Sequence, residues 1–337
     1  MLYVDVIIPT YNRVHFLRGL LASIAKALVP PDVKVVVTVV DNQSTDETHA
    51  VVKDIASRCE LAVRYLLQTR PGKSAALNAG IRDTSGDIVA FLDDDEIVSP
   101  GWFHCLARLF EDEQIDFISG RCLPRWGTSA PPPWLPPGYP AVIGALDGGT
   151  AMLEFEREYD GTLSGGNSAI RRRVLERVGL FSTQLGPRAD IRLLCCEDED
   201  IHLRLIDGGA RGVYAPELLV YHHVHPERLT RRYHRRWCFW RGVSKAVVYE
   251  ARQLGVRYIG RVPRFLYGSA MRGVLRVLCP AFGGGSAAAR FNAELAVWDL
   301  AGFLFGRYLY RPPEMREERV RHEAAAESAR CRVAAVG

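Results

Sequence analysis

Five apolar residues run directly into three acids at Ile88-Val89-Ala90-Phe91-Leu92-Asp93-Asp94-Asp95. A short, continuous apolar run of this kind is typical of a strand buried on both faces of a parallel sheet. In an open α/β sheet, ligands bind in the crevice beyond the carboxyl ends of such strands. Carboxylates at that place indicate a cation that holds an anionic ligand, and the alternative is a solvated acidic turn.

Segments with strand-like and helix-like patterns alternate around this run. The strand-like segments are residues 4–9, 33–40, 63–67 and 87–92, and helical spacing occupies 13–27, 46–57 and 72–82. Such alternation predicts right-handed βαβ crossovers, so we expect an α/β fold with a mostly parallel sheet flanked by helices. Farther along, residues 162–170 are predicted to re-enter the sheet, and residues 171–178 and 196–205 to form helices.

The character of the chain changes near His225, where Arg-rich and aromatic helix patterns begin. We therefore predict an α/β domain at residues 1–225, a basic, aromatic helical extension at 226–315 and a polar tail at 316–337. Residues 226–276 contain 13 Lys and Arg against two acids, a balance of +11. The whole chain of 337 residues carries +4, so the remainder carries −7.

Cations and aromatic residues are mixed from Arg228 to Arg241. Four interpretations are open: nucleic-acid binding, which we rank last, contact with an anionic membrane surface, binding of a phosphorylated lipid, and packing of a cationic helix against the acidic α/β domain. The charge of −7 in the rest of the chain favours packing.

The composition, 48% apolar and 24% charged, is that of an ordinary globular protein. The eight cysteines show no Cys-x-x-Cys spacing, which argues against a zinc ribbon and fits a reducing compartment. The first strand begins without the pattern of a signal peptide, and the longest uncharged stretch, residues 126–146, contains six prolines. We therefore expect no spanning helix and a cytoplasmic protein, or one peripheral at the inner face of the membrane.

Polar side chains also follow the second strand-like run and open the third helix. Asp41 lies at the strand end and is a candidate for contacting a base or ribose, whereas Asp46 reads as a helix N-cap. Arg70 and Lys73 stand at a helix N-terminus, where phosphate is attracted. The glycine spacing of a Walker phosphate loop is missing there.

Seven motifs follow one another at characteristic spacing. They are Val6-Ile7-Ile8-Pro9-Thr10-Tyr11-Asn12, Asp41-x4-Asp46, Gly72-x5-Asn78-x-Gly80, Gly86-Asp87, Phe91-Leu92-Asp93-Asp94-Asp95, Gly165-Gly166-Asn167 and Glu197-Asp198-x-Asp200-x3-Arg204. In this order, they make the chain resemble the family 2 glycosyltransferases of GT-A fold over roughly residues 3–225.

The resemblance implies an inverting enzyme that moves a sugar from a nucleotide-diphosphate sugar, with UDP and dTDP sugars favoured, to an acceptor hydroxyl. It also implies Mg²⁺ or Mn²⁺ at the Asp-x-Asp motif, bound by Asp95 and Asp93. The implied donor-site residues are Pro9, Thr10, Tyr11, Asn12, Asp41, Arg70, Lys73, Asn78, Asp93, Asp94, Gly166 and Asn167. Asp198 would be the general base, with Glu197 and Asp200 assisting, and this assignment is open by one position among acids 197–200.

Three histidines follow a strand-like run at Tyr221-His222-His223-Val224-His225. Because many GT-A enzymes place a histidine near the metal, His222 or His223 is a candidate third ligand, and His225 is assigned to the loop. The alternative is that local hydrogen bonds satisfy all three rings.

Two other functions are open. One is sugar transfer to a polyprenyl phosphate at the membrane surface, and the other is a non-catalytic module that binds sugar nucleotides or polyanions. The presence of every acid that the family motifs require argues against the second. The Pro-rich segment 124–140 is interpreted as an excursion near the mouth of the site, with an inert surface loop as the alternative.

Overall fold

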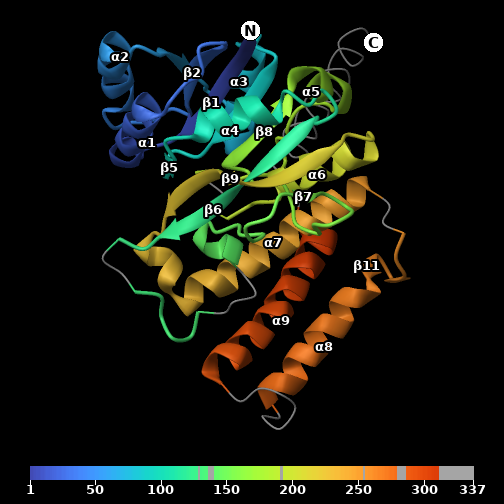
Figure 1. The fold of residues 1–337 in the computed structure, drawn as a ribbon. Coiled ribbons are helices and arrows are strands. Elements are labelled where there is room, and N and C mark those ends of the chain that lie inside the picture. Colours follow the sequence, from blue (N-terminus) through green and yellow to red (C-terminus); the bar gives the residue numbers. More distant parts are fainter. Residues whose placement is uncertain (128–129, 136–139, 190–192, 253–254, 279–285, 311–337) are drawn as a thin grey trace, which may run out of the picture.

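A central sheet is covered on both faces by helices, and three long helices extend from one side of this arrangement (Figure 1). The computed structural model describes residues 1–127, 130–135, 140–189, 193–252, 255–278 and 286–310. The predicted tail at 316–337 lies outside these described residues.

The sheet contains nine strands. They are β1 (Leu2–Thr10), β2 (Val33–Asp41), β3 (Ala62–Leu67), β4 (Ile88–Leu92), β5 (Glu96–Val98), β6 (Phe117–Arg125), β7 (Leu153–Glu154), β8 (Asn167–Arg171) and β9 (Gly212–His223). Their order is β3-β2-β1-β4-β8-β6-β9-β5, with β7 paired to β9. The first four strands are parallel, as predicted. In the second half, β6 and β9 are also parallel to each other, whereas β8, β5 and β7 are antiparallel to their partners, because these short strands are not preceded by crossover helices.

Helices cover the two faces of the sheet in separate layers. They are α1 (Val14–Lys26), α2 (Thr48–Arg58), α3 (Lys73–Arg82), α4 (Trp102–Leu109), α5 (Arg172–Val178) and α6 (Glu197–Asp207), with a short 3₁₀ turn η1 (Pro140–Ile143). Side chains of α1, α2 and α4 share one core with Val6 and Ile8, whereas those of α3, α5 and α6 share the other with Ile7. The alternation along β1 is the period of two that a doubly covered strand requires.

The predicted helix and strand positions agree with the structure through residue 92. Asp46 lies one residue before the N-cap of α2, which is Glu47, but its Oδ1 still accepts a hydrogen bond from the first helical N–H, that of Thr48, at 3.1 Å. Its Oδ2 accepts a second one from Val14 N, so the same carboxylate fixes the start of α1. Sequence reasoning missed β5, α4 and β6.

The extension after the sheet is helical, as expected. It contains η2 (Pro226–Leu229), α7 (Arg231–Ala251), the hairpin of β10 (Tyr258–Ile259) and β11 (Val262–Pro263), α8 (Arg264–Leu278) and α9 (Ala287–Tyr308). α7 packs on α9 and α9 packs on α8. The contact is close, since a Cβ on Gly302 of α9 would lie 1.8 Å from Phe239 O of α7. Among the described residues, no helix combines the length and apolarity needed to cross a bilayer.

Two cations of the basic helix α7 pair with acids of the extension, whereas Arg228, just before this helix, lies 3.9 Å from Asp95 of the α/β domain. Arg235 binds Glu294 with nitrogen–oxygen distances of 2.6 and 3.0 Å, and Arg241 lies 3.0 Å from Asp299. Both acids belong to α9, so these cations neutralise acids of the extension rather than those of the α/β domain.

The described part of the Pro-rich segment fastens the extension to the domain. The Trp134 ring lies 5.3 Å from the rings of both His234 on α7 and Phe291 on α9. This contact argues against an inert surface loop, and the interpretation of the segment as an excursion near the site mouth stays a prediction. Residues 136–139 lie outside the described part of the chain.

Candidate active site

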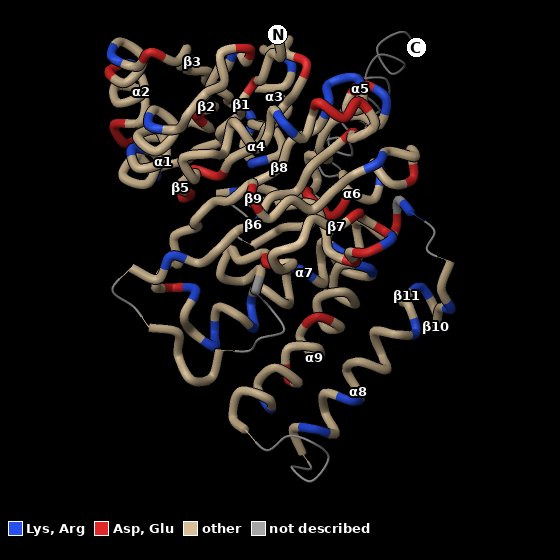
Figure 2. Tube along the Cα trace, viewed as in Figure 1, with Lys and Arg blue, Asp and Glu red and all other residues tan. Residues whose placement is uncertain are grey.

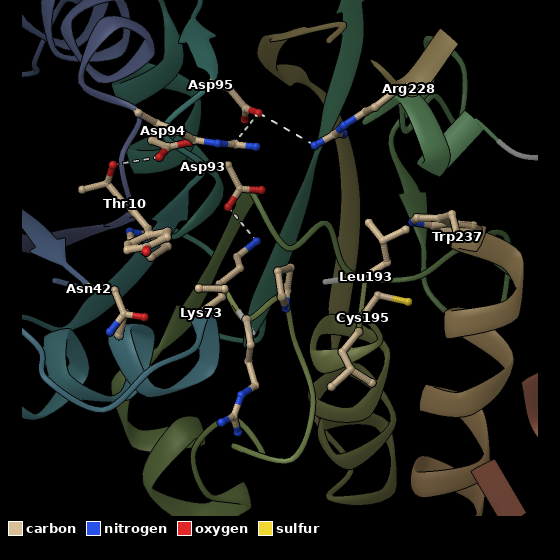
Figure 3. A pocket seen from close by; sticks show the side chains of 18 of the residues that line it. Thr10, Asn42, Lys73, Asp93, Asp94, Asp95, Leu193, Cys195, Arg228 and Trp237 are labelled. Carbon is tan, nitrogen blue, oxygen red and sulfur yellow. Dashed lines mark hydrogen bonds and ion pairs between the residues drawn. The ribbon is translucent and has the colours of Figure 1, made fainter. Parts of the chain in front are cut away.

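A cavity of about 340 Å³ opens at the carboxyl ends of β1 and β4. One wall comes from the strand ends and α3, and the other from residues 187–189, residues 193–195 and the extension (Figure 3). Its lining residues are Pro9, Thr10, Tyr11, Arg13, Asn42, Lys73, Ala76, Asp93, Asp94, Asp95, Pro187, Arg188, Ala189, Leu193, Leu194, Cys195, Arg228, Tyr233 and Trp237. Seven of the predicted residues, Pro9, Thr10, Tyr11, Lys73, Asp93, Asp94 and Asp95, are therefore brought together here.

Lys73 connects the two acid clusters that lie about a hundred residues apart in sequence. Its Nζ lies 2.6 Å from Asp93 Oδ1 and 3.6 Å from Glu197 Oε1. Burial lowers the pKa of Lys73, but the charges of Asp93 and Glu197 outweigh burial and leave that pKa raised. The ammonium therefore stays charged between the two carboxylates, and because Lys73 lines the cavity, it can also bind an anionic ligand there.

The backbone before Lys73 has a conformation that needs glycine. Gly72 has φ 119°, and its N–H donates to Asn42 Oδ1 at 2.7 Å. Asn42 Nδ2 in turn donates to Gln68 O and Arg70 O. This network sets the start of α3, and the sequence analysis had not selected Asn42.

Asp94 faces inward from the triplet. Thr10 Oγ1 donates to Asp94 Oδ2 at 2.8 Å, and Arg13 Nη1 lies 3.1 Å from Asp94 Oδ1. Burial and the neighbouring charge of Asp95 raise the pKa of Asp94 to about 7. Asp94 therefore anchors the triplet to β1 and α1.

Asp95 lies among cations and histidines. His225 Nε2 lies 2.7 Å from Asp95 Oδ2, His222 Nε2 lies 3.2 Å from Asp95 Oδ1, and Arg13 Nη1 lies 2.9 Å from Asp95 Oδ2. Burial would raise the pKa of Asp95, but His222, His225 and Arg13 outweigh it and hold that pKa well below its usual range. Arg228, 3.9 Å away, adds to this effect.

The histidine assignment needs a correction. His223 follows His222 on β9, so its side chain leaves the strand on the other side, and its ring centroid lies 5.1 Å from that of Phe16, which also packs against His225 at 4.7 Å. His225 lies in the loop after β9, as predicted, and its side chain is buried there against Asp95. The strand ends at His223, so the alternation of faces no longer applies at His225, and the sequence pattern alone carried no signal for this contact.

A divalent cation fits the donor set at this place. Carboxylate oxygens of Asp93 and Asp95 and the imidazole of His222 are ligand types that Mn²⁺ accepts. Among the described residues, the buried Nδ1 of His222 has no hydrogen-bond partner, and its Nε2 lies 3.2 Å from Asp95 Oδ1. Within the part of the chain that the structure describes, no group of three such side chains is already arranged as a metal site. The side chains now bind one another and would have to part around the ion.

Asp198 stands near the amino end of α6, beside Lys73. A Cβ placed on Gly165 would lie 3.3 Å from Asp198 Oδ2 and 3.5 Å from Lys73 Nζ, so the missing side chain leaves both groups room. Burial and the charge of Glu197 raise the pKa of Asp198 to about 7. A carboxyl with that pKa is suited to accepting a proton near neutral pH.

Asp200 has a different place from the one predicted for it. Its Oδ2 accepts two hydrogen bonds from Arg204, at 3.1 and 2.8 Å. Arg204 also donates to the carbonyls of Val178 and Gly179. Asp200 therefore stabilises the packing of α6 against the end of α5.

Two predicted donor-site residues serve the scaffold and do not line the cavity. Asn78 exchanges two hydrogen bonds with the backbone of Phe181, at 2.8 and 2.9 Å. Asn167 is fully buried, accepts from Trp102 Nε1 at 3.0 Å and donates to two backbone carbonyls. The Asn78 amide thus holds the loop after α5, and the Asn167 amide joins β8 to β6, β9 and α4.

Four further predicted residues lie around the cavity without lining it. Asp41 accepts hydrogen bonds from Tyr65 Oη and Ser44 N, and Asn12 accepts one from Thr45 N. Arg70 donates to Thr183 Oγ1. Gly166 faces the triplet, because a Cβ there would lie 2.8 Å from Asp93 Oδ2.

Comparison with known proteins identifies similar chains. The family described as Glycosyl transferase family 2 matches residues 5–179. The uncharacterized glycosyltransferase YwdF of Bacillus subtilis (strain 168) is 33% identical over 116 residues, which are 34% of this chain and 40% of that protein. The poly(ribitol-phosphate) beta-N-acetylglucosaminyltransferase TarS of Staphylococcus aureus (strain Mu50) is 29% identical over 118 residues, 35% of this chain and 20% of TarS. The match thus spans well under half the length of these relatives.

Solved structures share the fold over most of the chain. The mannosyltransferase PcManGT from Pyrobaculum calidifontis, in complex with GDP-Man and Mn²⁺, has a TM-score of 0.62 at 20% identity and covers 91% of this chain and 88% of its own. S. aureus TarS 1–349 in complex with UDP-GlcNAc has a TM-score of 0.52 at 16% identity, covering 91% and 93%. These likenesses confirm the expected GT-A fold.

Proposed function

The chain belongs to glycosyl transferase family 2, and on that premise we propose that it transfers a sugar from a nucleotide-diphosphate sugar to an acceptor hydroxyl, with inversion at the anomeric carbon. The observation that carries the proposal is Lys73, which lies within 3.6 Å of both Asp93 and Glu197 and so joins the Asp-x-Asp cluster to the cluster of Asp198. The base cluster then lies next to the cavity that offers a diphosphate site, with Lys73 in the cavity wall between them, although Glu197 and Asp198 do not line that cavity themselves. We keep residues 1–225 as the catalytic domain and 226–315 as the extension.

We assign the donor to the wall formed by Pro9, Thr10 and Tyr11 together with Lys73 and Asp93. Lys73 at the start of α3 supplies positive charge to a diphosphate, and the helix N-terminus adds to it. Similar structures hold UDP-GlcNAc or GDP-Man, so GDP sugars belong in the test beside the UDP and dTDP sugars that we favour.

Asp93, Asp95 and His222 would hold Mg²⁺ or Mn²⁺, and a structural relative contains Mn²⁺. When bound, the cation neutralises charge that builds up on the departing nucleoside diphosphate. Arg13 and Arg228, both close to Asp95, keep that carboxylate ionised and ready to bind.

Asp198 removes the proton from the acceptor hydroxyl as its oxygen forms a bond to the anomeric carbon. The bond from that carbon to the diphosphate oxygen breaks on the opposite side, which inverts the configuration. Lys73 lies between the base cluster and the Asp-x-Asp cluster and balances the negative charge of both. A positioned base contributes on the order of 10²–10⁴-fold to such a step.

The opposite wall is assigned to the acceptor. Leu193, Cys195, Tyr233 and Trp237 provide apolar and aromatic surface there, and Arg228 provides one cation (Figure 3). Aromatic faces suit the apolar face of a sugar ring. An acceptor that is already an anion, such as a polyprenyl phosphate, is the second candidate, because Arg228 and Arg188 line this cavity.

The test is a panel of UDP, dTDP and GDP sugars, measured first by thermal shift and then by hydrolysis or transfer with Mn²⁺, Mg²⁺ or EDTA. We expect one class of nucleotide sugar to raise the melting temperature of the protein. We also expect hydrolysis or transfer of that sugar, and loss of this activity when EDTA is added. Donor binding without any turnover, for every acceptor and metal tried, would instead support a non-catalytic binding module. The site of action that we propose is the cytoplasm or the inner face of the membrane.

A further inference from the structure

Within the described part of the chain, helix α8 packs against the protein through one of its faces. Leu266, Ala270 and Gly273 are buried on it, at positions i, i+4 and i+7. Gly273 allows close approach to α9, since a Cβ there would lie 2.4 Å from Ala293 O. The face pointing away from these three residues must therefore meet either solvent or a partner.

That outer face is apolar. Met271, Val274, Leu275 and Leu278 are 62%, 37%, 48% and 71% exposed. Their spacing of i, i+3, i+4 and i+7 places them in one stripe along the helix. Single exposed apolar residues are ordinary on protein surfaces, but a contiguous stripe on an outer helix indicates a contact surface.

The charges beside the stripe are all positive. Between Glu250 and Glu294 the sequence contains no Asp, Glu or Lys, and its seven arginines are Arg252, Arg257, Arg261, Arg264, Arg272, Arg276 and Arg290. Arg272 and Arg276 are exposed on α8, and Arg257 and Arg261 are exposed at the β10–β11 hairpin before it. Figure 2 marks these cations along α8 and at the hairpin.

This surface differs from that of α7, whose stretch from Arg228 to Arg241 we had first considered for membrane contact. On α7, Arg235 and Arg241 are neutralised by acids of α9. On α8, within the described part of the chain, the Arg272 side chain donates a hydrogen bond to Ser269, a neutral partner. The positive charge of α8 is therefore still available to an outside anion.

We propose that α8 lies flat in the surface of an anionic membrane, with Met271, Val274, Leu275 and Leu278 inserted among the acyl chains and Arg272 and Arg276 among the lipid headgroups. Apolar area and cationic charge on one helix are the two terms that drive binding of this kind. A helix of 15 residues is too short to span the bilayer, so the contact is peripheral.

Charge also distinguishes the membrane from a second copy of this chain. Two α8 helices packed through their stripes would bring the arginines of both copies together, with no acid on either helix to offset them. Anionic headgroups provide that compensation. The inference does not depend on the proposed enzymatic activity, because vesicle binding needs no turnover.

The test is flotation of the full chain with vesicles of phosphatidylcholine alone or mixed with phosphatidylglycerol. We expect binding to the anionic vesicles, little to the neutral ones, and weaker binding as salt is raised. Each arginine near an anionic surface raises the affinity for the membrane about fivefold, so the double variant R272E/R276E should bind at least roughly 25-fold more weakly. The double variant M271E/L275E should lose binding as well, because its stripe no longer inserts.

Matched controls exist elsewhere on the chain. R232E/R236E changes two exposed arginines of α7, and L28E changes a leucine that is 61% exposed after α1. Both should bind vesicles within about twofold of the unsubstituted chain. Equal unfolding temperatures for all variants would show that the folded protein is compared.

Three results would overturn the proposal. The first is that R272E/R276E and M271E/L275E bind vesicles as well as the unsubstituted chain does. The second is that only R232E/R236E loses binding. The third is that the unsubstituted chain binds no vesicles but forms a dimer in light scattering, and that M271E/L275E dissociates this dimer. The second result would assign the contact to α7, and the third would assign the α8 stripe to a second copy.

Discussion

His225 Nε2 lies 2.7 Å from Asp95 Oδ2, and both side chains are buried. The pair joins the end of β4 to the loop after β9, 130 residues later in the chain. A histidine that binds one carboxylate oxygen in this way fixes the orientation of the carboxylate, and so the direction in which the remaining lone pairs of the carboxylate point. If Asp95 binds the cation, His225 is therefore its positioning residue, next to the candidate ligand His222.

We expect H225A to weaken Mn²⁺ binding by about 10–100-fold, the usual effect of removing a partner that orients a metal ligand. H222A should weaken it at least as much, because that ring is a candidate ligand itself. H223A is the control on the same strand, since His223 faces Phe16, and its affinity should stay within about twofold. Isothermal titration with Mn²⁺ measures all three, and a defect confined to H223A would contradict this assignment.

Much of this arrangement could be predicted from the sequence because it depends on strand ends. Asp93, Asp94 and Asp95 follow a buried run, and parallel strands bring such ends to one edge of the sheet. The same reasoning placed Thr10 and Tyr11 at the cavity. This reasoning works because a strand that is buried on both faces has a fixed position and direction in the sheet, which leaves the residue after its end few possible positions.

The parts that could not be predicted depend on loops and on pairing between distant side chains. Asn78 and Asn167 carry the right chemistry for a ligand, but each is used by a backbone segment remote in sequence. Arg13 and Arg228 converge on Asp95 from the start of α1 and from η2. Nothing in their local patterns reports that convergence, because it depends on how the extension docks.

Replacing Asp198 by asparagine should reduce kcat by on the order of 10²–10⁴-fold, while donor binding changes by less than about threefold. Asparagine keeps the shape of the side chain but accepts no proton. D200N is the matched control on the same helix, because Asp200 binds Arg204 and should affect stability more than catalysis. Steady-state kinetics and donor titration separate the two effects, and a D198N variant with normal kcat would remove Asp198 from the base position.

The D198N variant should also be more stable than the unsubstituted chain at pH 8, but not at pH 4. Burial and Glu197 raise the pKa of Asp198 from the model-peptide value of about 3.9 to about 7 in the folded protein. A carboxyl with a raised folded pKa lowers the free energy of unfolding as pH climbs from the unfolded pKa through the folded one. Asparagine avoids this cost, so the difference in melting temperature should appear above about pH 4 and level off above about pH 7.

The ionisation of Asp198 should also control kcat/KM, which should rise with pH where the stability falls. Asp198 accepts a proton only when ionised, so kcat/KM should rise as pH increases through about 7 and then level off. Asp94 also has a pKa raised to about 7, but it faces Thr10 and Arg13 rather than the base cluster. The acidic limb should therefore persist in D94N and vanish from the residual activity of D198N. A limb lost in D94N alone would assign the titration to the triplet.

Gly166 should not tolerate even a methyl group. A Cβ at this position would lie 2.6 Å from Glu96 Oε1 and 2.8 Å from Asp93 Oδ2, closer than nonbonded atoms approach. The buried Glu96 cannot move far, because it accepts a hydrogen bond from Asp93 N. G166A should therefore displace Asp93 from Lys73 and reduce kcat/KM by at least about tenfold, since small misplacements at a reacting centre are costly. G101A, where a Cβ would meet nothing within 4 Å, is the control and should keep full activity. Steady-state kinetics with Mn²⁺ on both variants test this prediction. If G166A were as active as G101A, Asp93–Asp95 would be free to shift without loss of activity.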